Sequence, residues 1–175
     1  MTRPDDARLL GDVGGTNARF AWQASGGAEP SHVAAYPCAQ FESLESVLRH
    51  YLAQHGLPMP AQAAIGIANP VQGDWVQMTN HDWHFSIESL RQALGLRRLK
   101  LLNDFAALAW SLPTLRAHEL RAVGGGWGVP GGALALLGPG TGLGMSGLVQ
   151  DADARQVVIS GEGGHVTLAA CDDDE

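Results

Sequence analysis

Cysteine and positive charge are both scarce in this sequence. Its 175 residues include two cysteines, and 11 Lys and Arg stand against 18 Asp and Glu, which gives a formal net charge of -7 at pH 7. Cys38 and Cys171 have no metal-ligand neighbours, so they predict reduced thiols and argue against a disulfide framework or a structural zinc site. An acidic balance without a basic cluster argues against a nucleic-acid partner.

Long apolar runs are also missing. No stretch is long enough to span a bilayer, and residues 1–6 are polar and charged, unlike a signal peptide. The chain is nevertheless 45% hydrophobic, which suffices for a core of ordinary size. The composition therefore predicts a soluble cytoplasmic enzyme without a membrane partner.

Glycine, in contrast, is abundant, with 23 residues, and Gly11, Gly14 and Gly15 lie in residues 9–21 between two apolar stretches. This pattern predicts two strands joined by a tight turn, because glycine takes positive φ without steric cost. The backbone N–H groups around Gly14 and Gly15 can converge on a phosphate, and Asp12 beside it needs a cation such as magnesium, directly or through water. A structural turn with a capping Asp12 is an equal alternative.

A second stretch, residues 134–149, repeats the pattern of strand, Gly/Thr turn and strand, with Gly140, Thr141 and Gly142 at the turn. Helices and strands are predicted between the two hairpins. Serine caps at Ser43 and Ser86 open amphipathic helices, and an apolar strand is predicted over 63–68. Two phosphate-type hairpins separated in this way resemble the plan of the actin-like ATPase and sugar kinase superfamily, an α/β fold related to ribonuclease H.

Two tryptophans, Trp75 and Trp83, lie in a polar stretch over residues 71–86. Indoles among polar groups suit a carbohydrate-binding wall. They equally suit a twisted hairpin packed on the core, and the packing interpretation is favoured for both residues.

Asn103 and Asp104 stand where an apolar strand changes into an Ala/Leu-rich helix. Open α/β sheets place their ligands at this junction. Phosphate transfer to an alcohol needs a base for the hydroxyl proton, and Asp104 is the candidate. A plain helix N-cap would have the same pattern, so both interpretations remain.

Glu162 and His165 lie three residues apart in a glycine-rich turn after a strand predicted over 157–160. A carboxylate and an imidazole can together bind vicinal sugar hydroxyls. A metal site would need more ligands nearby, and a simple polar turn is the alternative.

Taken in order, these motifs resemble the zinc-free group of bacterial glucokinases, which phosphorylate the 6-hydroxyl of glucose with ATP in the first step of glycolysis. The matching motifs cover nearly the whole chain: GDVGGTNAR (11–19), IANPV (67–71), MTNH (78–81), NDF (103–105), GPGTGLG (138–144) and GEGGHV (161–166).

The resemblance implies a role for each motif. Asp104 would be the catalytic base, and Asn103, Glu162 and His165 would bind glucose with it. ATP phosphates would lie against the two hairpins, formed by Gly11, Asp12, Val13, Gly14, Gly15 and Thr16 and by Gly140, Thr141 and Gly142, with magnesium near Asp12. Residues 1–103 would form a small domain and residues 104–175 the start of a larger one.

The family continues through a further set of strands and helices that holds the adenosine pocket, so the resemblance implies an N-terminal part whose own activity is very low. Three alternatives remain open: a non-catalytic sugar-binding module derived from a kinase, a kinase for another hexose, and, for the full-length protein, a homodimer rather than a monomer.

Overall fold

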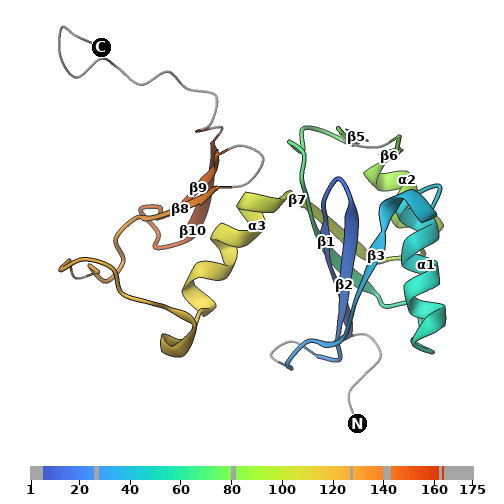
Figure 1. Ribbon diagram of the computed structural model, residues 1–175, viewed down its shortest axis with the longest axis horizontal. Coiled ribbons are helices and arrows are strands. Elements are labelled where there is room, and N and C mark those ends of the chain that lie inside the picture. Colours follow the sequence, from blue (N-terminus) through green and yellow to red (C-terminus); the bar gives the residue numbers. More distant parts are fainter. Residues whose placement is uncertain are drawn as a thin grey trace, which may run out of the picture. The chain divides into compact units, whose positions relative to one another are not determined.

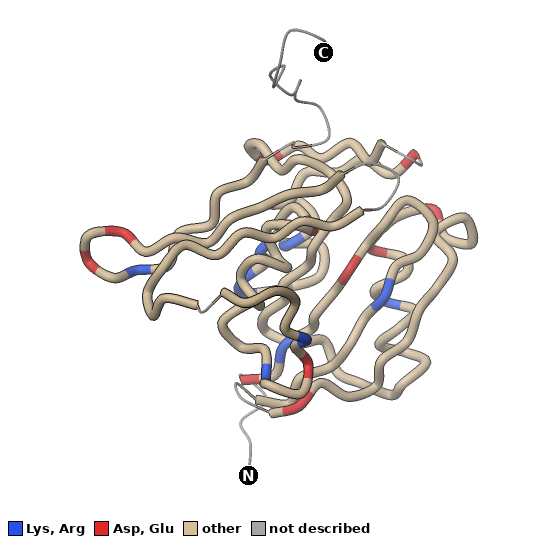
Figure 2. Tube along the Cα trace, turned by 60° about the vertical axis from the view of Figure 1, so that its left-hand side comes forward, with Lys and Arg blue, Asp and Glu red and all other residues tan. Residues whose placement is uncertain are grey.

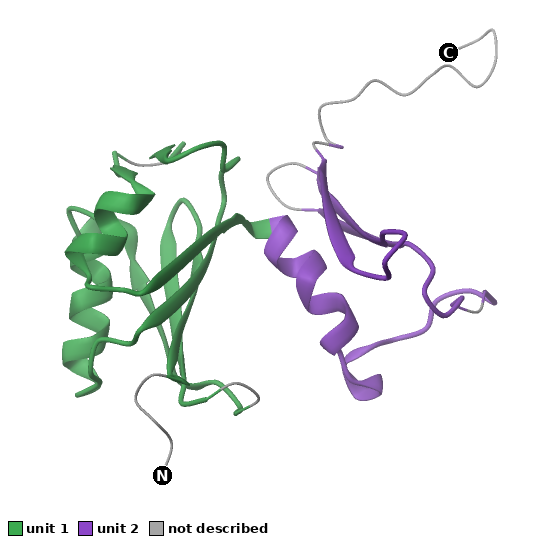
Figure 3. Ribbon diagram, turned by 180° about the vertical axis from the view of Figure 1, so that it is seen from behind, with its two compact units in different colours: residues 1–104 green, residues 105–175 purple. Residues whose placement is uncertain are grey.

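The computed structural model describes residues 6–25, 28–79, 82–126, 128–139, 143–161 and 163. The chain divides into two compact units, residues 1–104 and residues 105–175 (Figure 3). Their correspondence to the small and the larger domain stays a prediction.

A five-stranded mixed sheet forms the centre of the first unit, in the order β3-β2-β1-β4-β7 (Figure 1). The three antiparallel strands come first in the chain, and two further strands run parallel to β1. The strand bounds are β1 Arg8–Val13, β2 Asn17–Gln23, β3 Ser31–Pro37, β4 Gln62–Ile67 and β7 Arg98–Asn103. The hairpin predicted around residues 14–16 is thus confirmed as β1–β2.

Helices α1 (Leu44–Gln54) and α2 (Ile87–Ala93) pack against the apolar side of this sheet (Figure 1). The Ser43 hydroxyl accepts a hydrogen bond from the backbone N–H of Ser46 at 3.1 Å, which confirms the predicted cap of α1. The helical spacing of the apolar residues is also confirmed, because all of them are buried: Leu44, Val47, Leu48, Tyr51 and Leu52.

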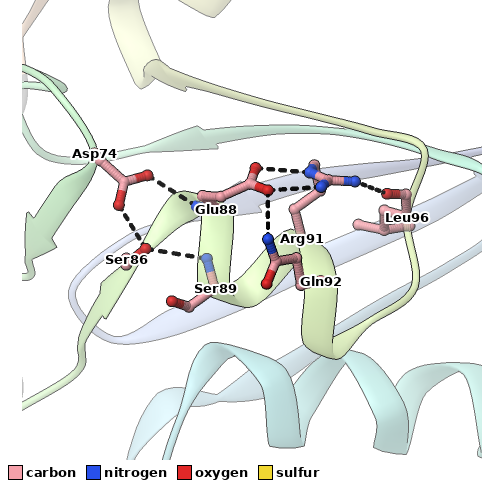
Figure 4. Close-up of polar contacts among 7 residues, drawn as sticks. All are labelled: Asp74, Ser86, Glu88, Ser89, Arg91, Gln92 and Leu96. Carbon is pink, nitrogen blue, oxygen red and sulfur yellow. Dashed lines mark hydrogen bonds and ion pairs between the residues drawn. The ribbon is translucent and has the colours of Figure 1, made fainter.

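Helix α2 begins at a polar junction with the loop before β5 (Figure 4). The Ser86 hydroxyl accepts from the backbone N–H of Ser89 at 3.0 Å, as its predicted capping role requires. Asp74 adds a second anchor, because its carboxylate accepts from the Ser86 hydroxyl at 2.5 Å and from the Glu88 backbone N–H at 2.9 Å. The loop and the helix are thereby joined.

The short strands β5 (Trp75–Gln77) and β6 (His84–Ser86) pair as a separate hairpin. Trp83 is buried, and its indole N–H donates to the Phe41 carbonyl at 3.0 Å, so the packing prediction is right for this residue. It is wrong for Trp75, whose side chain is 60% exposed. Alternation along β5 explains the exposure of Trp75, because the neighbouring Val76 takes the core side.

The second unit contains helix α3 (Asp104–Ser111), whose first residue belongs to the first unit, and a three-stranded antiparallel sheet in the order β10-β9-β8. The strands are β8 Leu134–Pro139, β9 Leu143–Gln150 and β10 Gln156–Gly161. The second predicted hairpin is confirmed as β8–β9. At the β9–β10 turn, Arg155 and Asp153 form an exposed ion pair at 3.4 Å. Figure 2 shows the positions of acidic and basic residues along the chain.

The glycines that flank the second hairpin turn have a packing role. Gly138 pairs with Gly144 across β8 and β9, and the Phe105 ring lies against both. A Cβ on Gly138 would stand 2.6 Å from the ring, and one on Gly144 would clash more severely. Side chains at these two positions would therefore displace Phe105.

Candidate functional site

The carboxyl ends of β1, β4 and β7 meet at one edge of the first unit's sheet. Because these strands are parallel and in register, Val13 pairs with Ile67 and Ile67 with Asn103. The residues that follow are the turn at 14–16, Asn69 and Asp104. Three of the predicted motifs are therefore brought together at the edge where open α/β sheets bind their ligands.

The turn at 14–16 is held by hydrogen bonds to Asn17 and Cys38. The Gly14 N–H closes the turn on the Asn17 carbonyl at 2.9 Å, and the Cys38 N–H donates to the Thr16 carbonyl at 2.8 Å. The Cys38 thiol lies 3.7 Å from the Gly14 carbonyl, to which it donates. This thiol is free and buried, and burial raises its pKa.

The residues predicted to contact phosphate are not equivalent. Val13 is fully buried, and Gly11 faces the core, where an added Cβ would lie 3.0 Å from Ile65. Both can reach a ligand only through backbone atoms. Gly14 differs, because its φ lies outside the left-handed region and an added Cβ would meet nothing closer than the Asn17 carbonyl at 3.7 Å. The positive φ expected of the glycine-rich turn is not found at Gly14, and neither backbone geometry nor packing demands glycine there.

Asp12 lies on the exposed face of β1, and its carboxylate is 3.2 Å from the Arg19 guanidinium. Both side chains are more than half exposed, so the pair contributes about 0–1 kcal/mol. The Asp12 carboxylate is therefore held only weakly and stays largely accessible to solvent.

Asn69 follows β4 and is 9% exposed. Its side-chain N–H donates to the Gln77 carbonyl at 2.8 Å, and its side-chain oxygen accepts from the Thr79 N–H at 3.1 Å. Both bonds reach the segment at the end of β5, so Asn69 fastens that segment to the carboxyl edge of the sheet.

Asn103 ends β7, and Asp104 begins α3, as the sequence predicted. The Asn103 side-chain N–H donates to the Asp104 carboxylate at 2.9 Å and reaches the Asn69 backbone carbonyl at 3.4 Å. These contacts orient the carboxylate of the candidate base and connect it to the Asn69 segment.

The other predicted site residues, Gly140, Thr141, Gly142, Glu162 and His165, lie outside the described residues. Their roles and their convergence with Asp104 stay predictions.

Asn69 was given no role from sequence, although a polar residue directly after a buried strand and before Pro70 was the available signal. The contacts of Cys38 with the turn left no signal, since they join segments distant in the chain.

Comparison with solved structures defines the fold class. The chain superposes on the glucokinase from an Antarctic psychrotroph with a TM-score of 0.85 at 37% identity, covering 96% of this chain and 53% of that one. The ROK hexokinase from Thermus thermophilus gives 0.64 at 19% identity, with 94% and 54% covered, and supports the fold alone. The chain therefore has the actin-like ATPase fold.

Sequence comparison then identifies the family. The Glucokinase family model matches residues 9–175, and the chain belongs to this family. It is 56% identical over 164 residues to a glucokinase of Aromatoleum aromaticum, covering 93% of this chain and 49% of that protein. It is 50% identical to the Bifunctional protein glk of Paraburkholderia xenovorans, with 98% and 26% covered. The chain spans about half the length of the curated glucokinases it matches, or less.

Proposed function

We propose that this chain supplies the first phosphate hairpin, the general base and part of the sugar site of an ATP-dependent glucokinase. The observation that carries the proposal is the carboxyl edge of β1, β4 and β7, where the turn at 14–16, Asn69 and the Asn103–Asp104 pair follow strands in register. A glucokinase relative with 56% identity supports glucose as the acceptor and ATP as the donor.

The hairpin would bind the phosphates through its backbone. The Gly14 N–H is used within the turn, so the N–H groups of Gly15 and Thr16 would take the phosphate oxygens. Glycine at 14 would allow a phosphate to approach the backbone closely, which accounts for a glycine that neither geometry nor packing requires. Magnesium bound with ATP would offset phosphate charge, and Asp12 would hold it through water.

Asp104 would take the proton of the glucose 6-hydroxyl as that oxygen attacks the γ-phosphorus. Its carboxylate is oriented for this role by the Asn103 side chain. Asn103, Glu162 and His165 would bind the other sugar hydroxyls. Positioning supplies most of the rate in phosphoryl transfer, so the bond from Asn103 to the base is as relevant as the base itself.

The test is formation of glucose 6-phosphate by two purified proteins. One is the 175-residue chain, and the other is the same chain joined to the carboxyl-terminal half of the Aromatoleum aromaticum glucokinase. We expect very low turnover from the first and glucokinase activity from the second, because ATP must be lined up with the hydroxyl. A panel of hexoses distinguishes glucose from fructose or an amino sugar as the acceptor.

Asp104→Asn in the joined protein should lower kcat by about a hundred- to ten-thousand-fold while the KM for glucose changes little. Glu162→Ala should instead raise that KM. Turnover by Asp104→Asn at close to the parent rate would show that another group is the base.

A further inference from the structure

A groove of about 510 Å³ lies between the start of α1, the β5–β6 hairpin and α2, all within the first unit. The residues that give it chemical character are Glu42, Glu45, Trp75, Asp82, His84 and Ser86. None of these has a role in the proposed phosphate transfer. Trp75 is a large exposed aromatic residue, with 60% of the residue accessible.

The groove combines an aromatic face with negative charge. The Trp75 ring lies against His84, with 5.8 Å between ring centroids and 37° between planes. Glu42 and Asp82 are exposed carboxylates without an ion pair or side-chain hydrogen bond to any described residue, whereas Glu45 pairs with Arg49 at 2.8 Å. No Lys or Arg is among the described residues that line the groove.

Hydrogen-bonding capacity in the groove includes several acceptors. Carboxylates accept only, and the Ser86 hydroxyl donates to Asp74 while it accepts from the Ser89 N–H. The Ser43 hydroxyl accepts the capping bond of α1. The Trp75 indole N–H and the Ser43 and Ser89 hydroxyls are side-chain donors at the groove. A guanidinium, which has five N–H donors and no acceptor, suits the carboxylates of this groove.

We propose that this groove binds an arginine-bearing segment of a partner protein. One guanidinium would stack on the exposed face of Trp75, where planar cations bind well, and would pair with the carboxylates of Glu42 and Asp82. Glu42 lies just before the start of α1, and Asp82 lies between strands β5 and β6. Because the two carboxylates come from different elements, the groove is suited to a short extended segment. The net charge of -7 adds a favourable long-range field.

The experiment titrates the 175-residue chain with a short capped peptide that contains two arginines, each flanked by glycine. Binding is followed through the indole N–H signal of Trp75 in a nitrogen-correlated proton NMR spectrum. A second peptide has citrulline, a neutral isostere, in place of arginine. We expect the arginine peptide to shift the Trp75 signal and to bind about tenfold more tightly than the citrulline peptide. Salt at about 0.5 M should weaken its binding severalfold.

Variants separate the groove from the rest of the surface. Trp75→Ala should abolish arginine-peptide binding measured by calorimetry, and Glu42→Gln and Asp82→Asn should each weaken it severalfold. Trp110→Ala and Asp153→Asn are matched controls, since Trp110 is 43% exposed and Asp153 has 68% side-chain exposure, and both lie in the second unit. They should bind like the parent.

Three results would overturn the proposal. Equal binding of the two peptides would show that charge has no role. A shift of Trp75 by glucose, with none by the arginine peptide, would identify a saccharide site. The third result is no shift of the Trp75 signal at arginine-peptide concentrations up to about 10 mM. The proposed contacts imply tighter binding than that, so this result would show that the groove does not bind an arginine-bearing segment. None of these readouts measures phosphate transfer, so the outcome is independent of the proposed function.

Discussion

Asn69→Ala is the substitution whose effect follows most directly from the geometry of the carboxyl edge. The amide of Asn69 makes one hydrogen bond in each direction, to the Gln77 carbonyl at 2.8 Å and from the Thr79 N–H at 3.1 Å. Each bond contributes about 1 kcal/mol net, and a backbone group left unpaired costs up to about 1–3 kcal/mol where water is excluded. Gln77 and Thr79 are themselves exposed residues, and both bonds are part-buried. Some of this is recovered where water reaches the segment, so we expect a loss of about 2–4 kcal/mol.

Two variants sharpen this expectation. Gln77→Ala is the matched control, because it removes an exposed side chain but keeps the carbonyl that Asn69 uses. It should cost less than about 0.5 kcal/mol. Asn69→Asp keeps the acceptor for Thr79 but places a carboxylate against the Gln77 carbonyl.

The pH dependence of Asn69→Asp has a definite sign. Burial and the nearby carbonyl oppose ionisation, so the pKa of this carboxyl in the folded state should exceed its unfolded value of about 3.9. The folded state then binds the proton more tightly, and the variant should regain stability relative to the parent as the pH falls through the folded-state pKa.

The assay is urea unfolding followed by circular dichroism, with amide hydrogen exchange at Thr79 as the local measurement. Asn69→Ala should speed exchange at Thr79 much more than Gln77→Ala does. Equal stability and equal Thr79 exchange in these two variants would refute the idea that the Asn69 amide fastens the segment after β5.

Three further predictions concern other elements. Gly144→Ala should destabilise the second unit by about 1–3 kcal/mol, because its Cβ would displace the Phe105 ring, whereas Gly147→Ala, with only ordinary contacts, should be close to neutral by thermal unfolding. Asp74→Ala should lower stability by about 1 kcal/mol in the same assay, because the anchor of α2 is lost. Hydrogen bonds from Arg91, and then Gln92, lower the pKa of Glu88 to about 2 from 4.5, so the stabilisation is present above pH 4.5 and is lost as the pH falls toward 2. Glu88→Gln should flatten that part of a stability profile against pH, and an unchanged profile would contradict the assignment.

Local patterns predicted the elements of the first unit well. The face of α1, its Ser43 cap and the β1–β2 hairpin are written in short-range spacing, and the structure confirms all three. The change from strand to helix at Asn103 and Asp104 was equally visible, because apolar strand residues give way directly to helix formers.

Side-chain environments were less predictable, because they depend on segments that meet only in the fold. Trp75 and Trp83 have similar sequence surroundings, yet one is exposed and the other donates to a carbonyl 42 residues away. The hydrogen bonds from Asn69 to the segment after β5 and those from Cys38 to the hairpin turn also join segments that meet only in the fold. No periodicity in the sequence records which distant backbone group a polar side chain will reach.

Glycine shows most clearly why a motif and a ligand site are different things. Gly11 and Gly144 belong to the motifs that suggested phosphate binding, yet a Cβ at the first would press on Ile65 and at the second on Phe105. Packing alone accounts for glycine at both positions. At Gly14 no such contact exists and φ is unexceptional, as is also true of Gly125, Gly126 and Gly128, which lie outside both hairpins. Asking what an added Cβ would touch thus identifies the glycines that the core requires, and Gly14 is not one of them. If the proposed phosphate contact is right, Gly14→Ala should therefore impair ATP binding more than stability.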